Sequence, residues 1–281
     1  MQHLKVTQKV SIMGDVSSDR IGRLGERKFE DLCDRAGLAV SRPFPDMTGK
    51  DRHVEFPFVE PVGSLTFDTR SAPLACYVQA KTLLAKNDRF EMPLPAAERL
   101  ARETKPCFVG RDAHRDKSVF VDMYLVHVSG EVLAKILKSL REEQAKGSTH
   151  LNRKKITFSI SLGLKVDLTP DTLREALSSA IGDDMLAYTV CKHRQFKALG
   201  YDTARFEGNV TFGPLKFEQF VDGLSGLSEL PVMNMEHFER RFDIRLPYPP
   251  DVPEAPKAIP RNADRATSER SLHCHGKKRG E

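Results

Sequence analysis

The chain has 281 residues, of which 40% are hydrophobic and 30% charged, and its formal net charge is +5. This length accommodates one large domain or two small ones with a substantial buried core, and the composition is ordinary for a soluble globular protein. No apolar run approaches the ~20 residues that a membrane-spanning helix needs, which argues against a membrane protein.

Residues 1–5 contain no apolar stretch of the kind found in signal peptides. The five cysteines are odd in number and never spaced as C-x-x-C, which argues against structural zinc and against a disulfide framework. We therefore expect a cytoplasmic protein with no membrane partner. The mild positive charge is compatible with a polyanionic partner, although many proteins without one are equally basic.

The first half of the chain alternates helical and extended patterns. Apolar residues at helical spacing predict a helix over residues 18–36 that ends at Gly37. A short extended piece at residues 38–40 and a turn-rich loop at 42–50 follow. The next predicted elements are strands at 53–59 and 75–82, a hairpin connection at 60–73 between them, a helix at 95–104, and strands at 107–110 and 119–128. This mixture predicts an α/β fold with a mixed sheet.

The second half begins with an amphipathic helix over residues 131–146 and an alternating strand over 155–162. Thr169 and Pro170 predict the start of a helix that runs to Gly182. Further predictions are a helix at 184–199, a strand at 204–212, and short helices near Phe217 and Phe238. Prolines crowd the chain from Pro247, and few large apolar residues follow, so we predict a disordered tail over residues 247–281.

Four polar residues in the first third of the chain suggest a metal site. Glu26 lies on the predicted first helix, and Asp51 follows a turn where a strand begins. Gln79 and Lys81 are two apart in a strand and therefore share one of its faces. Mg²⁺ prefers hard oxygen ligands and needs only one or two carboxylates, because it keeps several of its waters.

In the predicted site, Asp51 supplies the main carboxylate, and the Gln79 side-chain oxygen and the Ala80 main-chain carbonyl complete the protein ligands. Lys81 orients the attacking water and offsets negative charge on the phosphate. Glu26 reaches the metal through a bound water or through a second ion. A divalent cation placed in this way promotes hydrolysis of phosphodiesters.

The segments GERKFEDLCDRAG, PFPDMTGKDRHVEF and YVQAKT resemble the PD-(D/E)xK, or restriction-endonuclease-like, superfamily. They are most similar to the Mrr-like restriction enzymes and the nuclease effectors of bacterial anti-phage systems. The resemblance covers residues 14–128. It implies an αβββαβ core, dependence on Mg²⁺ or Mn²⁺ and DNA as the substrate, with Glu26, Asp51, Gln79 and Lys81 at the family's motif positions.

Several alternatives stay open. Gln79 stands where many relatives have glutamate, and a neutral amide holds a cation less strongly than a carboxylate. Asp46 is a second acidic candidate in the turn before Asp51, and Glu55 shares a face with Asp51 if the strand is regular. The loop at 111–117 is a candidate for DNA contact. The basic clusters at 153–155 and 192–194 fit either phosphate contacts or ordinary solvated faces.

The predicted function is a metal-dependent endonuclease that hydrolyses DNA in bacterial restriction or anti-phage defence. Residues 14–128 form its nuclease core, and residues 129–246 form an α/β extension for dimerisation, targeting or partner binding. The predicted partners are DNA, a second copy of the chain and a sensor or ATPase on a separate polypeptide. The alternative is a catalytically inactive nuclease fold that binds nucleic acid or a protein.

Overall fold

The computed structural model describes residues 18–43, 50–58, 68, 71–84, 87–114, 120–202 and 205–248. Asp46, most of the predicted connection at 60–73 and the predicted tail from residue 249 lie outside these ranges. The chain divides into two compact units, and each draws on separate stretches of sequence. The first comprises Met1–Met92, Lys105–Val128 and Thr157–Tyr188, and the second comprises Pro93–Thr104, Ser129–Ile156 and Thr189–Glu281.

A six-stranded sheet with the order β1-β2-β3-β5-β6-β8 forms the centre of the first unit. Its strands are β1 (Ala39–Ser41), β2 (Arg52–Glu55), β3 (Ala75–Leu84), β5 (Cys107–His114), β6 (Phe120–His127) and β8 (Leu164–Val166). β3 and β5 run parallel, and every other neighbouring pair is antiparallel. The protein is therefore α/β with a mixed sheet, as predicted.

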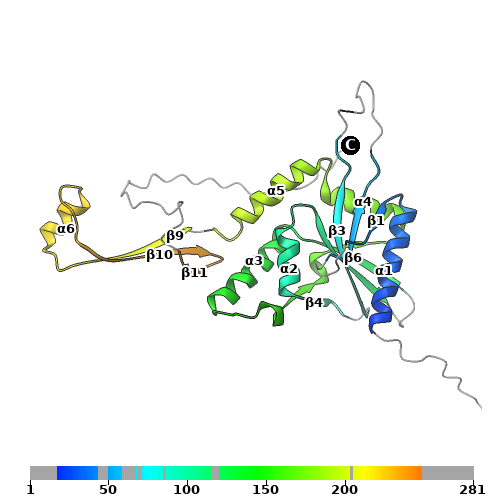
Figure 1. The fold of residues 1–281 in the computed structure, drawn as a ribbon, viewed down its shortest axis with the longest axis horizontal. Coiled ribbons are helices and arrows are strands. Elements are labelled where there is room, and N and C mark those ends of the chain that lie inside the picture. Colours follow the sequence, from blue (N-terminus) through cyan, green and yellow to red (C-terminus); the bar gives the residue numbers. More distant parts are fainter. Residues whose placement is uncertain are drawn as a thin grey trace, which may run out of the picture. The chain divides into compact units, whose positions relative to one another are not determined.

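Two helices, α1 (Ser18–Arg35) and α4 (Pro170–Ile181), share one hydrophobic core with this sheet (Figure 1). The predicted apolar stripe of α1 supplies Phe29 and Leu32, and Gly37, at φ +69°, follows the helix in the left-handed region that favours glycine. The Thr169 hydroxyl accepts a hydrogen bond from the Thr172 amide and caps α4, as predicted. The core also contains Cys33, Val54, Cys76, Val78, Phe108, Met123, Leu125, Leu173 and Leu177.

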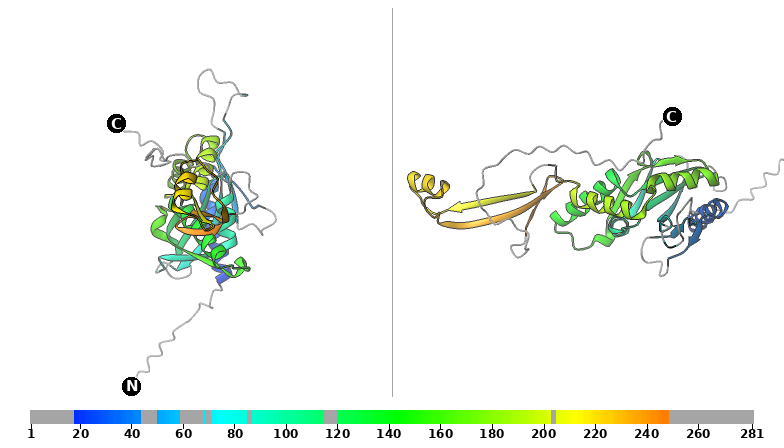
Figure 2. Two further views of the ribbon diagram at one scale, coloured as in Figure 1. Left: turned by 90° about the vertical axis from the view of Figure 1, so that its left-hand side faces the viewer. Right: turned by 90° about the horizontal axis from the view of Figure 1, so that it is seen from above.

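The second unit contains most of the remaining helices and a three-stranded sheet with the order β11-β10-β9. Its elements are α2 (Leu94–Arg102), α3 (Gly130–Ala145), η3 (Leu151–Arg153), most of α5 (Met185–Ala198), β9 (Phe206–Phe212), α6 (Phe217–Leu224), β10 (Val232–Arg241) and β11 (Ile244–Pro247). β9 and β10 form a long ribbon with α6 at its turn (Figure 2). Large apolar side chains around this turn are exposed, among them Phe217 at 80%, Leu227 at 79% and Met233 at 73%.

The structure corrects several predicted elements. The short helix expected near Phe238 is wrong, because residues 232–241 form β10 and pair with β9. β4 (Arg89–Pro93), which pairs with β7 (Lys155–Ser159), was missed. The alternating pattern predicted a strand to Leu162, but β7 ends at Ser159 and the chain continues as η4 (Ile160–Leu162). Pro247 ends β11, so the described chain is still a strand where the tail was predicted to begin.

Cys33, Cys76 and Cys107 are free and buried. Across the part of the chain that the structure describes, no helix combines the length and apolar character needed to cross a membrane.

Candidate active site

Asp51 lies immediately before β2, one position beyond the paired residues Arg52 and Val78. Its backbone amide donates a hydrogen bond to the Val78 carbonyl at 3.1 Å. Its carboxylate Oδ2 accepts a hydrogen bond from the Ala80 amide at 2.7 Å. Because the N–H and C=O of one strand residue point toward the same antiparallel neighbour, the Ala80 carbonyl also faces the Asp51 side of β3.

Gln79 and Lys81 share the face of β3 opposite to Cys76 and Val78, which pack in the core. Lys81 is half-buried, but Gln79 is only 5% exposed. Its Oε1 atom is one of two buried side-chain polar atoms without a hydrogen-bond partner among the described residues, the other being Thr82 Oγ1. A buried acceptor without a partner destabilises a fold by about 1–3 kcal/mol, so Gln79 Oε1 is a candidate ligand atom.

The residues at this junction fit a hard divalent cation. They offer the Asp51 carboxylate, the orphaned Gln79 Oε1 and the Ala80 carbonyl, which are all oxygen donors of the type that Mg²⁺ and Mn²⁺ accept. Asp51, Gln79 and Ala80 occupy adjoining positions on neighbouring segments of the sheet. Asp51 and Ala80 are in direct contact, and Gln79 and Lys81 are the residues on either side of Ala80 in β3.

Glu26 lies on α1, which packs on the face of the sheet opposite to Gln79 and Lys81, and it binds Arg52. Arg52 is opposite Val78 in the β2–β3 ladder, so it projects to the side covered by α1. Its Nη2 donates to Glu26 Oε2 at 2.7 Å, and its Nε donates to Glu30 Oε1 at 2.6 Å. Its Nη1 donates to the Asp51 carbonyl at 2.6 Å. Arg52 therefore ties the start of β2 to α1.

The ion pairs of Arg52 with Glu26 and Glu30 were not predicted, although the sequence contains a pattern that indicates them. Glu26 and Glu30 are four residues apart on one helix and therefore lie on the same side of it. The predicted strand began at His53, which left Arg52 in the preceding loop. Starting the strand at Arg52 would have placed a charged side chain toward the core, where only an ionic partner satisfies it.

Glu55, the auxiliary candidate that the structure describes, does not join this group. Glu55 is paired with Ala75 at the other end of β2 and is exposed, about 13 Å along the strand from Asp51 at 3.3 Å per residue. Asp46 lies outside the described residues, as do residues 115–117 of the loop proposed to contact DNA. Residues 111–114 of that loop form the end of β5 instead.

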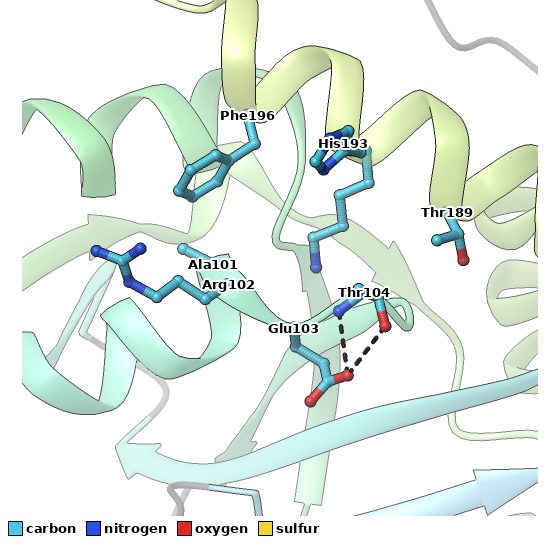
Figure 3. A pocket seen from close by; sticks show the side chains of 8 residues that line it. Ala101, Arg102, Glu103, Thr104, Thr189, His193 and Phe196 are labelled. Carbon is cyan, nitrogen blue, oxygen red and sulfur yellow. Dashed lines mark hydrogen bonds between the residues drawn. The ribbon is translucent and has the colours of Figure 1, made fainter. Parts of the chain in front are cut away.

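A cavity of about 200 Å³ lies in the second unit and contains none of the predicted site residues. Figure 3 shows Phe196 and His193 of α5 facing the end of α2 at Arg102. Lys192, 4% exposed, donates from Nζ to the Leu100 carbonyl at 3.3 Å and so satisfies an end group of α2. The predicted solvated or phosphate-contacting role is therefore wrong for Lys192, because its ammonium group is buried.

In the described ranges, no three His, Cys, Asp or Glu side chains are grouped to hold a metal. The candidate site instead combines one carboxylate with amide and main-chain oxygens. No protein-family model matches the chain, and no curated protein or solved structure matches it either. The functional assignment therefore depends on the arrangement of the residues themselves.

Proposed function

We propose that the protein is a Mg²⁺- or Mn²⁺-dependent endonuclease that hydrolyses DNA phosphodiester bonds at the junction of β2 and β3. The observation that carries this proposal is the pairing of Asp51 with the Ala80 amide, the residue next in sequence to Gln79 with its orphaned Oε1. A carboxylate and a buried, unpartnered amide oxygen at adjoining positions are the kind of oxygen ligands that such a cation binds.

The order of elements supports the same proposal. The chain runs α1, β1, β2, β3, β4, α2 and β5, with β3 parallel to β5 and with β4 paired to β7 outside the six-stranded sheet. This order accords with the αβββαβ core that the resemblance to the PD-(D/E)xK superfamily implies. We accordingly propose a restriction-endonuclease-like core within residues 14–128, with residues 129–246 as an extension.

In this site Asp51, Gln79 and the Ala80 carbonyl would hold the cation. A bound cation of this kind polarises the scissile phosphate and makes its bound water a better nucleophile. Lys81 projects from the same face of β3 as Gln79, so its ammonium would orient the attacking water and offset charge on the phosphate. The Ala80 amide fixes one Asp51 oxygen and so orients the carboxylate.

Glu26 has a different part in the proposal. Its carboxylate is bound to the buried Arg52, whose guanidinium also holds the Asp51 carbonyl. We propose that Glu26 and Glu30 position the metal ligand Asp51 through Arg52. A direct role for Glu26 at a second ion or through a metal-bound water would require an ion near the α1 side of β2.

The extension offers a surface for the predicted self-association. Apolar side chains on and around α6 are exposed, and such patches are typical of interaction sites. We propose that two copies associate through α6, because symmetric pairing of one patch with itself is the commonest way to form a dimer. Light scattering of the wild type should then show a mass above the 31.6 kDa of one chain. The Phe217→Asp variant should show the mass of the monomer. An unchanged mass in this variant would contradict the proposal.

The proposed setting is the cytoplasm of a bacterium, in restriction or anti-phage defence, with DNA as the substrate and a sensor or ATPase as a separate polypeptide.

Cleavage of plasmid DNA tests the activity. Wild-type protein should cleave with Mg²⁺ or Mn²⁺ and stop when the metal is chelated. Asp51→Asn and Lys81→Met should reduce the rate about 10²- to 10³-fold. Lys138→Met, on an exposed position of α3, is the matched control. Cleavage at the wild-type rate by both site variants would reject the assignment.

The burial of Gln79 favours one alternative. At 5% exposure, a neutral amide is a weaker and less accessible ligand than the glutamate found in many nucleases. A catalytically inactive fold that binds nucleic acid would show salt-sensitive DNA binding without cleavage under any divalent metal. Stoichiometric metal binding that is lost in Asp51→Asn would instead favour the nuclease.

A further inference from the structure

Two lysines and a histidine surround the ring of Tyr77 in the first unit. Lys50 Nζ lies 4.2 Å from the centroid of the Tyr77 ring, and Lys105 Nζ lies 5.7 Å from it. The rings of His53 and Tyr77 are 5.0 Å apart, and Lys105 Nζ lies 3.3 Å from His53 Nε2. These four residues, which we call the Tyr77 cluster, come from the segment before β2, from β2, from β3 and from the segment before β5.

The cluster lies next to the candidate active site. His53 is opposite Tyr77 in the β2–β3 ladder, so the two side chains share a face. Tyr77 precedes Gln79 by two positions on β3, which places both on one face about 6.6 Å apart along the strand. This separation is on the order of one nucleotide step along an extended strand.

The chemistry of the cluster suits a phosphate group. Gathering two ammonium groups at one ring brings like charges together, and the cation–π attraction of Tyr77 offsets part of that repulsion. The Lys105 ammonium can only donate, so the contact at 3.3 Å makes His53 Nε2 the acceptor and fixes the position of Lys105. A phosphate beside the Tyr77 ring would be attracted to both ammonium groups.

We propose that Lys50, His53, Tyr77 and Lys105 form a subsite for the backbone phosphate of the DNA nucleotide adjacent to the scissile bond. The subsite rests on the proposed nuclease function for its relation to cleavage, but the binding itself does not require metal or hydrolysis. The lysines would neutralise the phosphate, His53 would orient Lys105, and Tyr77 would hold both ammonium groups in place.

Binding of a short single-stranded DNA, followed by fluorescence anisotropy in a metal chelator over a range of salt concentrations, tests the subsite. Lys50→Gln and Lys105→Gln should each weaken binding about three- to tenfold and reduce the slope of log affinity against log salt by about 0.7, the value for one phosphate contact on a single strand. Lys138→Gln on exposed α3 is the charge-matched control and should change neither quantity. Thermal unfolding of each variant checks that the fold is retained.

The outcomes separate the subsite from the nuclease. If both lysine variants bind DNA with wild-type affinity and slope, the subsite is overturned, whether or not the protein cleaves DNA. If both lose binding while wild-type protein never cleaves, the subsite stands and the nuclease assignment falls. An RNA of the same sequence provides the last arm: losses confined to RNA would overturn the assignment of DNA as the ligand.

Discussion

The Asp51 carboxylate accepts a hydrogen bond from the Ala80 amide at 2.7 Å, one position beyond the last pair of the β2–β3 ladder. This bond joins a candidate metal ligand to the strand that carries the others. It also gives Asp51 a structural role, because the amide of Ala80 would otherwise lose a partner. Variants of Asp51 must therefore separate folding from metal binding.

Replacing Asp51 with asparagine or alanine separates these two roles. Asparagine retains an oxygen that can accept a hydrogen bond from the Ala80 amide. The free energy of unfolding of Asp51→Asn should therefore lie within about 1 kcal/mol of the wild-type value. Asp51→Ala removes the acceptor and should lower the free energy of unfolding by about 1–3 kcal/mol. Urea unfolding in a chelator measures both. Equal stability of the two variants would show that the Asp51–Ala80 bond contributes nothing.

The orphaned oxygen of Gln79 makes its substitutions informative. Gln79→Leu removes a buried polar atom that has no partner. In the absence of metal, its midpoint of thermal unfolding should therefore equal or exceed that of the wild type. Gln79→Glu should destabilise the metal-free protein by roughly 2 kcal/mol, because it buries a carboxylate. Saturating Mn²⁺ should restore Gln79→Glu, since a ligand at about 100 times its Kd adds about 2.7 kcal/mol. A thermal shift with Mn²⁺ that is the same in both variants would argue against Gln79 as a ligand.

Two arginines contact the same carboxylate, and only one is buried. Arg52 is 3% exposed and Arg42 is 65% exposed, and both contact Glu30. Arg52→Ala leaves Glu26 and Glu30 without their buried partner and should lower the free energy of unfolding by about 3 kcal/mol. Arg42→Ala should lower it by less than about 1 kcal/mol, because exposed ion pairs contribute little. Chemical denaturation compares them, and similar losses would refute the central role of Arg52.

The contribution of Glu143 to the stability of the second unit should depend on pH. Hydrogen bonds from Lys154, then Lys146 and Ser148, lower the pKa of its carboxyl from 4.5 to about 2. A group with a lowered folded-state pKa adds stability that is fully present above its unfolded pKa and is lost as pH falls through the folded value. The difference in thermal midpoint between wild type and Glu143→Gln should therefore shrink from about pH 4.5 to about pH 2. A difference that does not change over this window would contradict the pairing.

Local sequence patterns predicted the helices whose formation depends on residues close together in the sequence. The stripe of Phe29, Leu32 and Cys33 defined α1, and the cap at Thr169 defined the start of α4. β10 could not be predicted in this way, because its Met, Glu and Arg residues favour a helix and its pairing with β9 overrides that preference. β4 was missed although its buried Phe90 and Met92 alternate with exposed residues, a pattern that a five-residue window would have detected.

The sequence indicated where the candidate site residues lie on their strands, but not which contacts they make with one another. The two-residue spacing placed Gln79 and Lys81 on one face, and the turn placed Asp51 at the start of a strand. The bond from Ala80 to Asp51 depends on the register of β2 against β3, which no local pattern specifies. The burial of Arg52 and the convergence of Lys50 and Lys105 on Tyr77 likewise depend on distant segments meeting.

A shared cation site is tested most directly by titrating Mn²⁺ into the protein by calorimetry. Wild-type protein should bind one ion per chain at the β2–β3 junction, and Asp51→Asn and Gln79→Leu should each abolish that binding while their unfolding midpoints show that they remain folded. Mn²⁺ binding of wild-type affinity and stoichiometry in both variants would contradict the site.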